Sequence, residues 1–162
     1  MPEAASARGL IDTSVVIDLD HVDTSALPAK IAIAAVTLAQ LAAGPHATAD
    51  PTERARRQQR LQLVEATFDA IPFDSAAARA YGRVYAEVAA AGRKARGRRA
   101  VDLLIAATAV GAGLPLYTRN PTDFDGLGTV LKVRTVTAKR PLPERQRPAR
   151  ERSRRQPRAK DQ

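Results

Sequence analysis

The chain has 162 residues, a formal net charge of +9 and no cysteine. Its length suits one domain with a sizeable core, and the lack of cysteine excludes disulfides and thiol chemistry and favours a reducing cytoplasm. Only two histidines are present, which argues against a zinc cluster. No apolar run is long enough to span a bilayer, and the start of the chain lacks the apolar segment of a secretory signal.

The positive charge is concentrated at the C-terminal end. From Lys139 onward, ten Lys or Arg stand against three acids, which gives this segment a net charge of +7 and leaves +2 on residues 1–138. The segment is rich in Arg, Pro, Gln and Glu and has almost no apolar residues, so it cannot bury enough surface to fold. We therefore predict a folded domain over residues 1–138 and a basic, disordered tail over 139–162.

The first predicted strand ends at an acid. A short apolar run stops at Asp12, and Thr13, Ser14 and a second apolar run follow, which predicts a buried strand and then a helix capped by a hydroxyl. An acid at the tip of a buried strand is suited to metal or acid–base chemistry, although Asp12 also stands where a helix N-cap would stand. Residues 30–36 predict a second strand, and Thr37 and Gln40 have the spacing of a capping box at the next helix.

Two basic segments occur in the middle of the chain. Residues 51–68 predict a helix whose first half carries an arginine cluster, at positions 54, 56, 57 and 60. This cluster could contact phosphates, but such a charge run on a surface helix is usually a solvated face. A strand at 70–73 and a helix at 75–91 follow, and then a basic loop at 92–99. This loop leads directly toward Asp102, so it is the better candidate for contacts with phosphate groups.

The next helix carries a second acid near its start, and a third acid follows the strand after it. Apolar residues from Val101 onward recur at helical spacing, with Asp102 at the end where the helix dipole favours a carboxylate. Residues 114–117 predict a buried strand, and the polar loop after it has Asn120 as a candidate N-cap and Asp123 where a capping carboxylate would stand. A last edge strand is predicted at 130–133.

Strands and helices alternate along this body, which predicts an α/β fold with a mainly parallel sheet covered on both faces. Right-handed crossovers then bring Asp12 and the loop at 118–123 to one edge of the sheet. Asp12, Asp102 and Asp123 offer only oxygen ligands, which select Mg²⁺ or Mn²⁺ over zinc. Such ions activate water and neutralise charge when a phosphodiester is cleaved.

Four motifs in this order carry a specific resemblance: LIDTSVVI, AVTLAQLAAG, RRAVDLLIAATA followed by GLPLYTRN, and the pair DF at 123–124. Over about residues 9–134 the chain resembles PIN-domain proteins of the VapC toxin family, the ribonuclease half of type II toxin–antitoxin modules. The resemblance implies a three-layer α/β/α sandwich around a parallel sheet of about five strands. It also implies Mg²⁺- or Mn²⁺-dependent endoribonuclease activity, a homodimer, and inhibition by a VapB-type antitoxin.

Carried over by position, the resemblance makes Asp12 and Asp102 the principal metal ligands and has Asp123 complete the acidic cluster. Polar support would come from three neighbouring residues, Thr13, Thr118 and Asn120. The basic loop and the strand end supply the candidate RNA contacts, which are Arg96, Arg98, Arg99 and Arg119.

The chain departs from the family pattern at Gln40. Similar proteins read T-x-x-E-L there, and the glutamate is an acid of the site. Glutamine has nearly the same size, and its carbonyl can still touch a metal or its water, but it lacks the charge and cannot accept a proton. Natural divergence and a substitution introduced to make a toxic protein producible both account for it.

Two alternatives to an active ribonuclease follow. One is a catalytically weakened or silent PIN domain that binds RNA or its antitoxin without cutting. The other treats the acids as helix caps in an interaction module whose working part is the basic tail.

Overall fold

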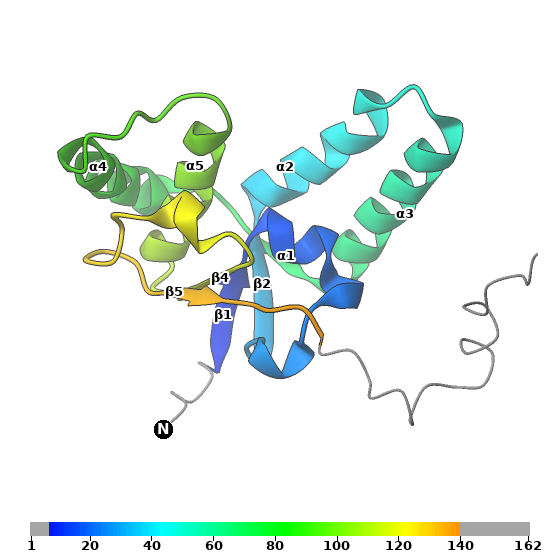
Figure 1. The fold of residues 1–162 in the computed structure, drawn as a ribbon, viewed down its shortest axis with the longest axis horizontal. Coiled ribbons are helices and arrows are strands. Elements are labelled where there is room, and N and C mark those ends of the chain that lie inside the picture. The colour runs from blue at the N-terminus through cyan, green and yellow to red at the C-terminus, as the bar shows by residue number, and fades with distance from the viewer. Residues whose placement is uncertain (1–6, 140–162) are drawn as a thin grey trace, which may run out of the picture.

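A computed structural model describes residues 7–139 of the chain. Its centre is a five-stranded sheet in the order β3-β2-β1-β4-β5, in which every pair of neighbours is parallel (Figure 1). The strands are β1 (Arg8–Ile11), β2 (Lys30–Ala34), β3 (Asp69–Ile71), β4 (Leu116–Thr118) and β5 (Val133–Thr135). The parallel α/β architecture predicted from the alternating pattern is confirmed.

Helices cover both faces of the sheet (Figure 1). They are α1 (Thr13–Ile17), α2 (Ala35–Ala43), α3 (Pro51–Thr67), α4 (Ser75–Ala90) and α5 (Arg98–Gly111). Alternate strand residues enter different cores, as expected when both faces of a strand are buried. Leu10 and Leu116 pack in one core with residues of α4 and α5. Ile11 and Tyr117 pack in the other core with residues of α1, α2 and α3.

Two helices begin earlier than the sequence predicts. Helix α2 begins at Ala35, directly after β2, and Ala34 makes no side-chain cap. The predicted capping box is therefore wrong: Thr37 is fully buried inside the helix, and Gln40 lies about a turn further on. Helix α5 begins at Arg98 rather than near Val101 because Gly97 adopts a positive φ of 58°, which glycine accommodates at a helix start.

The strand limits differ by a few residues. Strand β2 ends at Ala34 instead of residue 36, and β5 runs over 133–135 instead of 130–133. The cause of the second difference is a tight turn in which Val130 N and Leu131 N both donate to Leu127 O. This turn places Leu127 and Leu131 in the core before the strand starts.

The carboxyl ends of β1 and β4 lie together, as predicted. The backbone N of Asp12 donates to Tyr117 O at 3.0 Å, so the first residue after β1 lies beside the end of β4. Apart from Lys139, the predicted tail lies outside the described residues. Lys139 N donates to His21 O, and its Nζ donates to Asp20 O at 2.9 Å. No helix within residues 7–139 has the length and apolar character needed to cross a membrane.

Candidate active site

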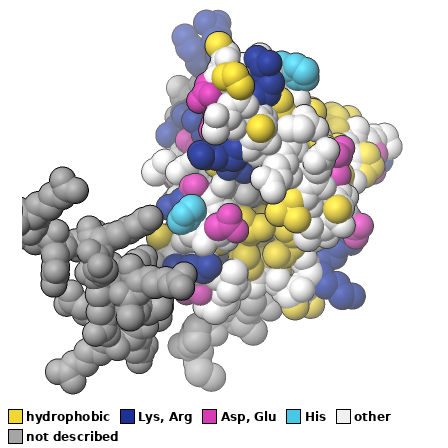
Figure 2. Space-filling model, turned by 90° about the vertical axis from the view of Figure 1, so that its right-hand side faces the viewer, with side chains coloured by type: hydrophobic (Ala, Val, Ile, Leu, Met, Phe, Trp, Pro, Cys, Tyr) yellow, Lys and Arg dark blue, Asp and Glu magenta, His cyan; other side chains and the backbone are white. Residues whose placement is uncertain are grey.

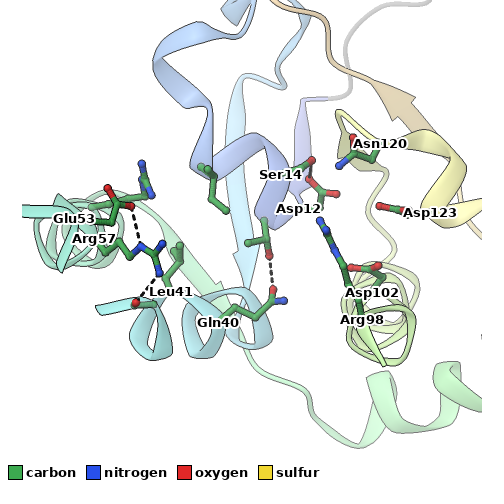
Figure 3. A pocket seen from close by; sticks show the side chains of 14 residues that line it. Asp12, Ser14, Gln40, Leu41, Glu53, Arg57, Arg98, Asp102, Asn120 and Asp123 are labelled. Carbon is green, nitrogen blue, oxygen red and sulfur yellow. Dashed lines mark hydrogen bonds and ion pairs between the residues drawn. The ribbon is translucent and has the colours of Figure 1, made fainter. Parts of the chain in front are cut away.

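A cleft of about 540 Å³ opens at this edge of the sheet (Figure 3). Its walls come from α1, α2, α3, α5 and the segment after β4. The lining residues are Asp12, Thr13, Ser14, Ile17, Gln40, Leu41, Gly44, Glu53, Arg57, Arg60, Arg98, Asp102, Asn120 and Asp123. The three acids singled out in the sequence thus face one space, although they come from three separate parts of the chain.

Asp12 is held on both of its carboxylate oxygens and is only 6% exposed. Its Oδ1 accepts hydrogen bonds from Ser14 Oγ at 2.6 Å and from Val15 N at 3.2 Å, and its Oδ2 accepts from Thr118 Oγ1 at 2.6 Å. The cap of α1 is therefore Asp12 itself and not a hydroxyl residue. Burial raises the pKa of Asp12, and the hydrogen bonds from Ser14 and Thr118 oppose that rise.

Two further hydrogen bonds hold the segment after β4, one within that segment and one to the start of α1. Thr118 Oγ1 accepts from Asn120 N at 3.0 Å, and Ser14 Oγ accepts from Arg119 N at 3.1 Å. The fully buried Thr118 side chain thus links Asp12 to the backbone of Asn120, whose residue also lines the cleft. The sequence pattern indicated no role for Ser14 beyond helix capping. A hydroxyl two residues after a strand-end acid is the local signal that would have identified it.

Asp102 lies in the second turn of α5, so a first-turn interaction with the helix dipole does not explain it. Burial first, and then the negative charges of Asp123 and Asp12, raise the pKa of Asp102 to about 6, against the opposing effect of Arg98 and Arg99. Figure 3 shows Asp102 and Asp123 on the same side of the cleft as Asp12. The carboxylates are therefore close enough to repel one another.

Gln40 lines the cleft in an orientation that the sequence did not indicate. Thr13 Oγ1 donates to Gln40 Oε1 at 2.5 Å and lies 3.1 Å from Thr37 Oγ1. The carbonyl of the amide is thus already engaged, and the amide nitrogen points toward the side of the cleft that holds Asp102 (Figure 3). One lone pair of this carbonyl oxygen is thus used by Thr13, and the other is left for a metal or its water.

Only one of the four arginines predicted to contact RNA lines the cleft. Arg98 lines the cleft, one helical turn before Asp102, whereas the other three predicted RNA contacts, Arg96, Arg99 and Arg119, are not among the lining residues. The Arg119 guanidinium instead forms an ion pair with Asp18. Arg57 and Arg60 of α3 also line the cleft and are partly exposed, whereas Arg54 and Arg56 of the same cluster are exposed and are not among the lining residues.

The donor set suits a hard divalent cation. As the side chains stand, residues 7–139 contain no group of three or more His, Cys, Asp or Glu arranged to hold a metal ion. Mg²⁺ does not require such a group, since it is often bound through one or two carboxylates together with waters and substrate phosphates. Burial is the main cause of the raised pKa of Asp102, and the charges of Asp123 and Asp12 add to it; a bound cation would offset both effects.

Residues 9–128, nearly all of the described body, match the PIN domain family. The parallel sheet and the acidic cleft are therefore those of a PIN-domain protein.

Similar proteins show to which family of PIN-domain proteins the chain belongs. The chain is 35% identical to Ribonuclease VapC5 of Mycobacterium tuberculosis over 133 residues, which are 80% of this chain and 95% of that protein. It is 36% identical to Ribonuclease VapC8 of the same species over 110 residues, 67% of this chain and 96% of that protein. A crystal structure of VapBC-5 from M. tuberculosis, a member of the VapBC family of toxin–antitoxin systems, superposes with a TM-score of 0.69 and 37% identity, covering 80% of this chain and 97% of that one. The chain belongs to the VapC ribonuclease toxin family of PIN-domain proteins.

Proposed function

We propose that this protein is a divalent-metal-dependent endoribonuclease whose reaction takes place in the cleft between α3 and α5. The observation that carries the proposal is the convergence of Asp12, Asp102 and Asp123 on one space, with the pKa of Asp102 raised to about 6. Carboxylates that lie close enough in a cleft to repel one another are typical of a site that binds a cation.

Each residue has a distinct role in this proposal. Asp12 and Asp102 hold Mg²⁺ or Mn²⁺, and Asp123 contributes directly or through a water molecule. The bound ion supplies water activation and neutralises the charge of the phosphodiester. The bonds from Thr118 and Ser14 fix the Asp12 carboxylate, so that it does not reorient when the site fills. Arg98 at the rim attracts the phosphate of the RNA.

The family relationship extends the proposal to partners. Since the similar M. tuberculosis structure is described as a member of the VapBC toxin–antitoxin family, we propose that a VapB-like antitoxin binds this chain and inhibits it. A homodimer and a cytoplasmic location, both expected from the resemblance and the composition, belong to the same proposal.

The test compares the wild-type chain with Asp102→Asn. We expect Mn²⁺ to bind the wild type in calorimetry and single-stranded RNA to be cut only when Mg²⁺ or Mn²⁺ is present. In the variant both binding and cleavage should fall by about 100-fold. Undiminished Mn²⁺ affinity in Asp102→Asn would remove Asp102 from the ligand set.

A second candidate function is a weakened or silent PIN domain that binds RNA or antitoxin. The observation that favours it is Gln40, whose carbonyl oxygen is engaged by Thr13 and which adds no charge to the site. The same assay separates the two candidates: a wild-type protein that binds Mn²⁺ and RNA but leaves the RNA intact supports the silent form.

A further inference from the structure

The wall opposite the acids is formed by α3, and the arginines on it have no role in the proposal so far. Glu53, Arg57 and Arg60 line the cleft from α3. Figure 3 shows Glu53 and Arg57 on one side of the cleft and Asp12, Asp102 and Asp123 on the other. Seen from the side of the molecule on which α3 lies, Lys and Arg side chains are spread over the surface, with Asp and Glu side chains among them (Figure 2).

Arg57 is oriented before any ligand arrives. Its Nε donates to Glu53 Oε1 at 2.9 Å, and its Nη1 donates to Gly44 O at 2.9 Å. These bonds attach the guanidinium both to its own helix and to the turn that joins α2 to α3. Within residues 7–139, Nη2 makes no hydrogen bond. Because a guanidinium is planar, two fixed nitrogens also fix the direction of the third.

Arg60 lies one helical turn beyond Arg57 and makes no hydrogen bond within residues 7–139. Residues three apart on a helix share a face, and both arginines line the cleft from this face of α3. Glu53 balances one of the two positive charges, and the lining part of α3 therefore carries a net charge of +1. The cleft thus has acids on one wall and basic side chains on the other. A polyanion that binds in it would be oriented by this difference in charge.

We propose that Arg57 and Arg60 bind backbone phosphates of the RNA strand next to the phosphate that is cut. They act as positioning residues: they hold the strand across the cleft while the acidic side performs the reaction. This inference rests on the proposed function, since it takes RNA as the ligand. The role of Glu53 is to hold the Arg57 guanidinium in an orientation that faces the cleft.

The first experiment measures binding without catalysis. The full chain is titrated against a fluorescently labelled 12-nucleotide single-stranded RNA in EDTA, and anisotropy is followed at several salt concentrations. We expect Arg57→Ala/Arg60→Ala to weaken binding about tenfold or more at 0.1 M salt. The slope of log affinity against log salt should decrease by about 1.4, because each single-strand phosphate contact contributes about 0.7.

Two control variants test whether the loss of binding depends on the position of the arginines or only on the loss of positive charge. Arg56 is on the same helix and also pairs with Glu53, at 3.5 Å, but it does not line the cleft and its side chain is 67% exposed. Arg56→Ala should change binding by less than about twofold. A second control, Arg79→Ala/Arg83→Ala on α4, removes two charges on an exposed face. Arg60→Ala alone is also measured, since it breaks no described hydrogen bond and cannot act by releasing α3.

Cleavage with Mn²⁺ gives the second readout. We expect Arg57→Ala/Arg60→Ala to raise KM for the 12-nucleotide RNA with little change in kcat. A dinucleotide should be little affected, because it has no phosphate beside the one that is cut. Binding losses in Arg60→Ala and the double variant no larger than in the two controls would overturn the inference. If the wild type binds RNA through these arginines but cleaves nothing with metal, the proposed ribonuclease function fails while the positioning role stands.

Discussion

At the scale of single residues, Asp12 is a buried acid and Asp102 a half-buried one; both have raised pKa values, yet they are held differently. Asp12 accepts three hydrogen bonds and links α1 to β4. Asp102 has two acidic neighbours, Asp123 and Asp12, that disfavour its charged form. Removing the Asp12 carboxylate should lower the stability of the folded protein, whereas neutralising Asp102 should raise it.

The first prediction concerns Asp102→Asn without metal. An ionised Asp102 destabilises the folded state, because its pKa is about 6 there and about 3.9 in an unfolded chain. The folded protein therefore binds more protons, and the wild type gains stability as the pH falls through about 6. With allowance for solvent screening, Asp102→Asn should be more stable by on the order of 1 kcal/mol at pH 7.5.

Urea unfolding in EDTA at pH 7.5 and pH 5.0 measures this difference. The advantage of the variant should shrink at the lower pH, since the wild-type carboxyl is by then mostly protonated. A wild type that matches or exceeds the variant at pH 7.5 would contradict the repulsion argued for this cluster.

The second prediction concerns Gln40→Glu. One glutamate oxygen can keep the bond from Thr13, and the other takes the place of the amide nitrogen that points across the cleft. The added charge should strengthen Mn²⁺ binding and raise ribonuclease activity. It should also lower stability without metal, and Mn²⁺ should restore it.

Calorimetry, a cleavage assay and thermal unfolding with and without Mn²⁺ check the three parts. Gln59→Glu on the exposed face of α3 is the matched control, since it makes the same chemical change away from the cleft. Equal metal affinity and equal cleavage in Gln40→Glu and the wild type would place position 40 outside the site.

At the scale of elements, the packing of α4 against α5 depends on a close approach at Gly111. A Cβ at this position would lie 2.8 Å from Ala77 N and 2.9 Å from Ala77 Cα. Since backbone atoms of α4 cannot move aside as a side chain tip can, the helix that carries Asp102 would have to shift. The small residue is thus a requirement of the site's geometry as well as of the core.

The third prediction compares two glycines. Gly111→Ala should destabilise the protein by about 1–3 kcal/mol, as overpacked sites do. Gly82 lies in the interior of α4, and a Cβ added there would meet no atom within 4 Å, so Gly82→Ala should stabilise by about 0.5–1 kcal/mol. Thermal or urea unfolding measures both. Equal effects in the two variants would show that the α4–α5 contact is looser than described.

At the scale of the whole molecule, the charge of the chain is divided between body and C-terminal segment. Residues 1–138 carry a net charge of +2, so almost all of the net positive charge belongs to residues 139–162. Arginines that line the cleft can contact particular phosphates, while the charges of the C-terminal segment would contribute a general attraction to RNA that salt screens.

The fourth prediction is therefore that deletion of residues 140–162 leaves the fold intact. The cut keeps Lys139 and its bonds to His21 and Asp20. We expect the Tm to change by no more than about 3 °C, and RNA affinity to fall most at low salt. A variant with every Lys and Arg of this segment replaced by Gln separates charge from length. A large loss of thermal stability would show that the segment packs on the domain.

The sequence alone determined the order of the elements, the parallel sheet and the acids that reach one edge of it. These follow from local rules: apolar periodicity sets helix or strand, and parallel strands end on the same side. The motifs around Asp12 and Asp102 then identified the family.

Only the tertiary structure decided how the cleft is lined. Arg57 and Arg60 face the site while Arg96 and Arg119 do not, because the direction of α3 depends on its packing through Val64 and on the bond from Arg57 to Gly44. The orientation of Gln40 likewise depends on Thr13, which lies 27 residues away in the chain. Periodicity assigns residues to a face of their own helix, but contacts between distant elements determine what that face meets.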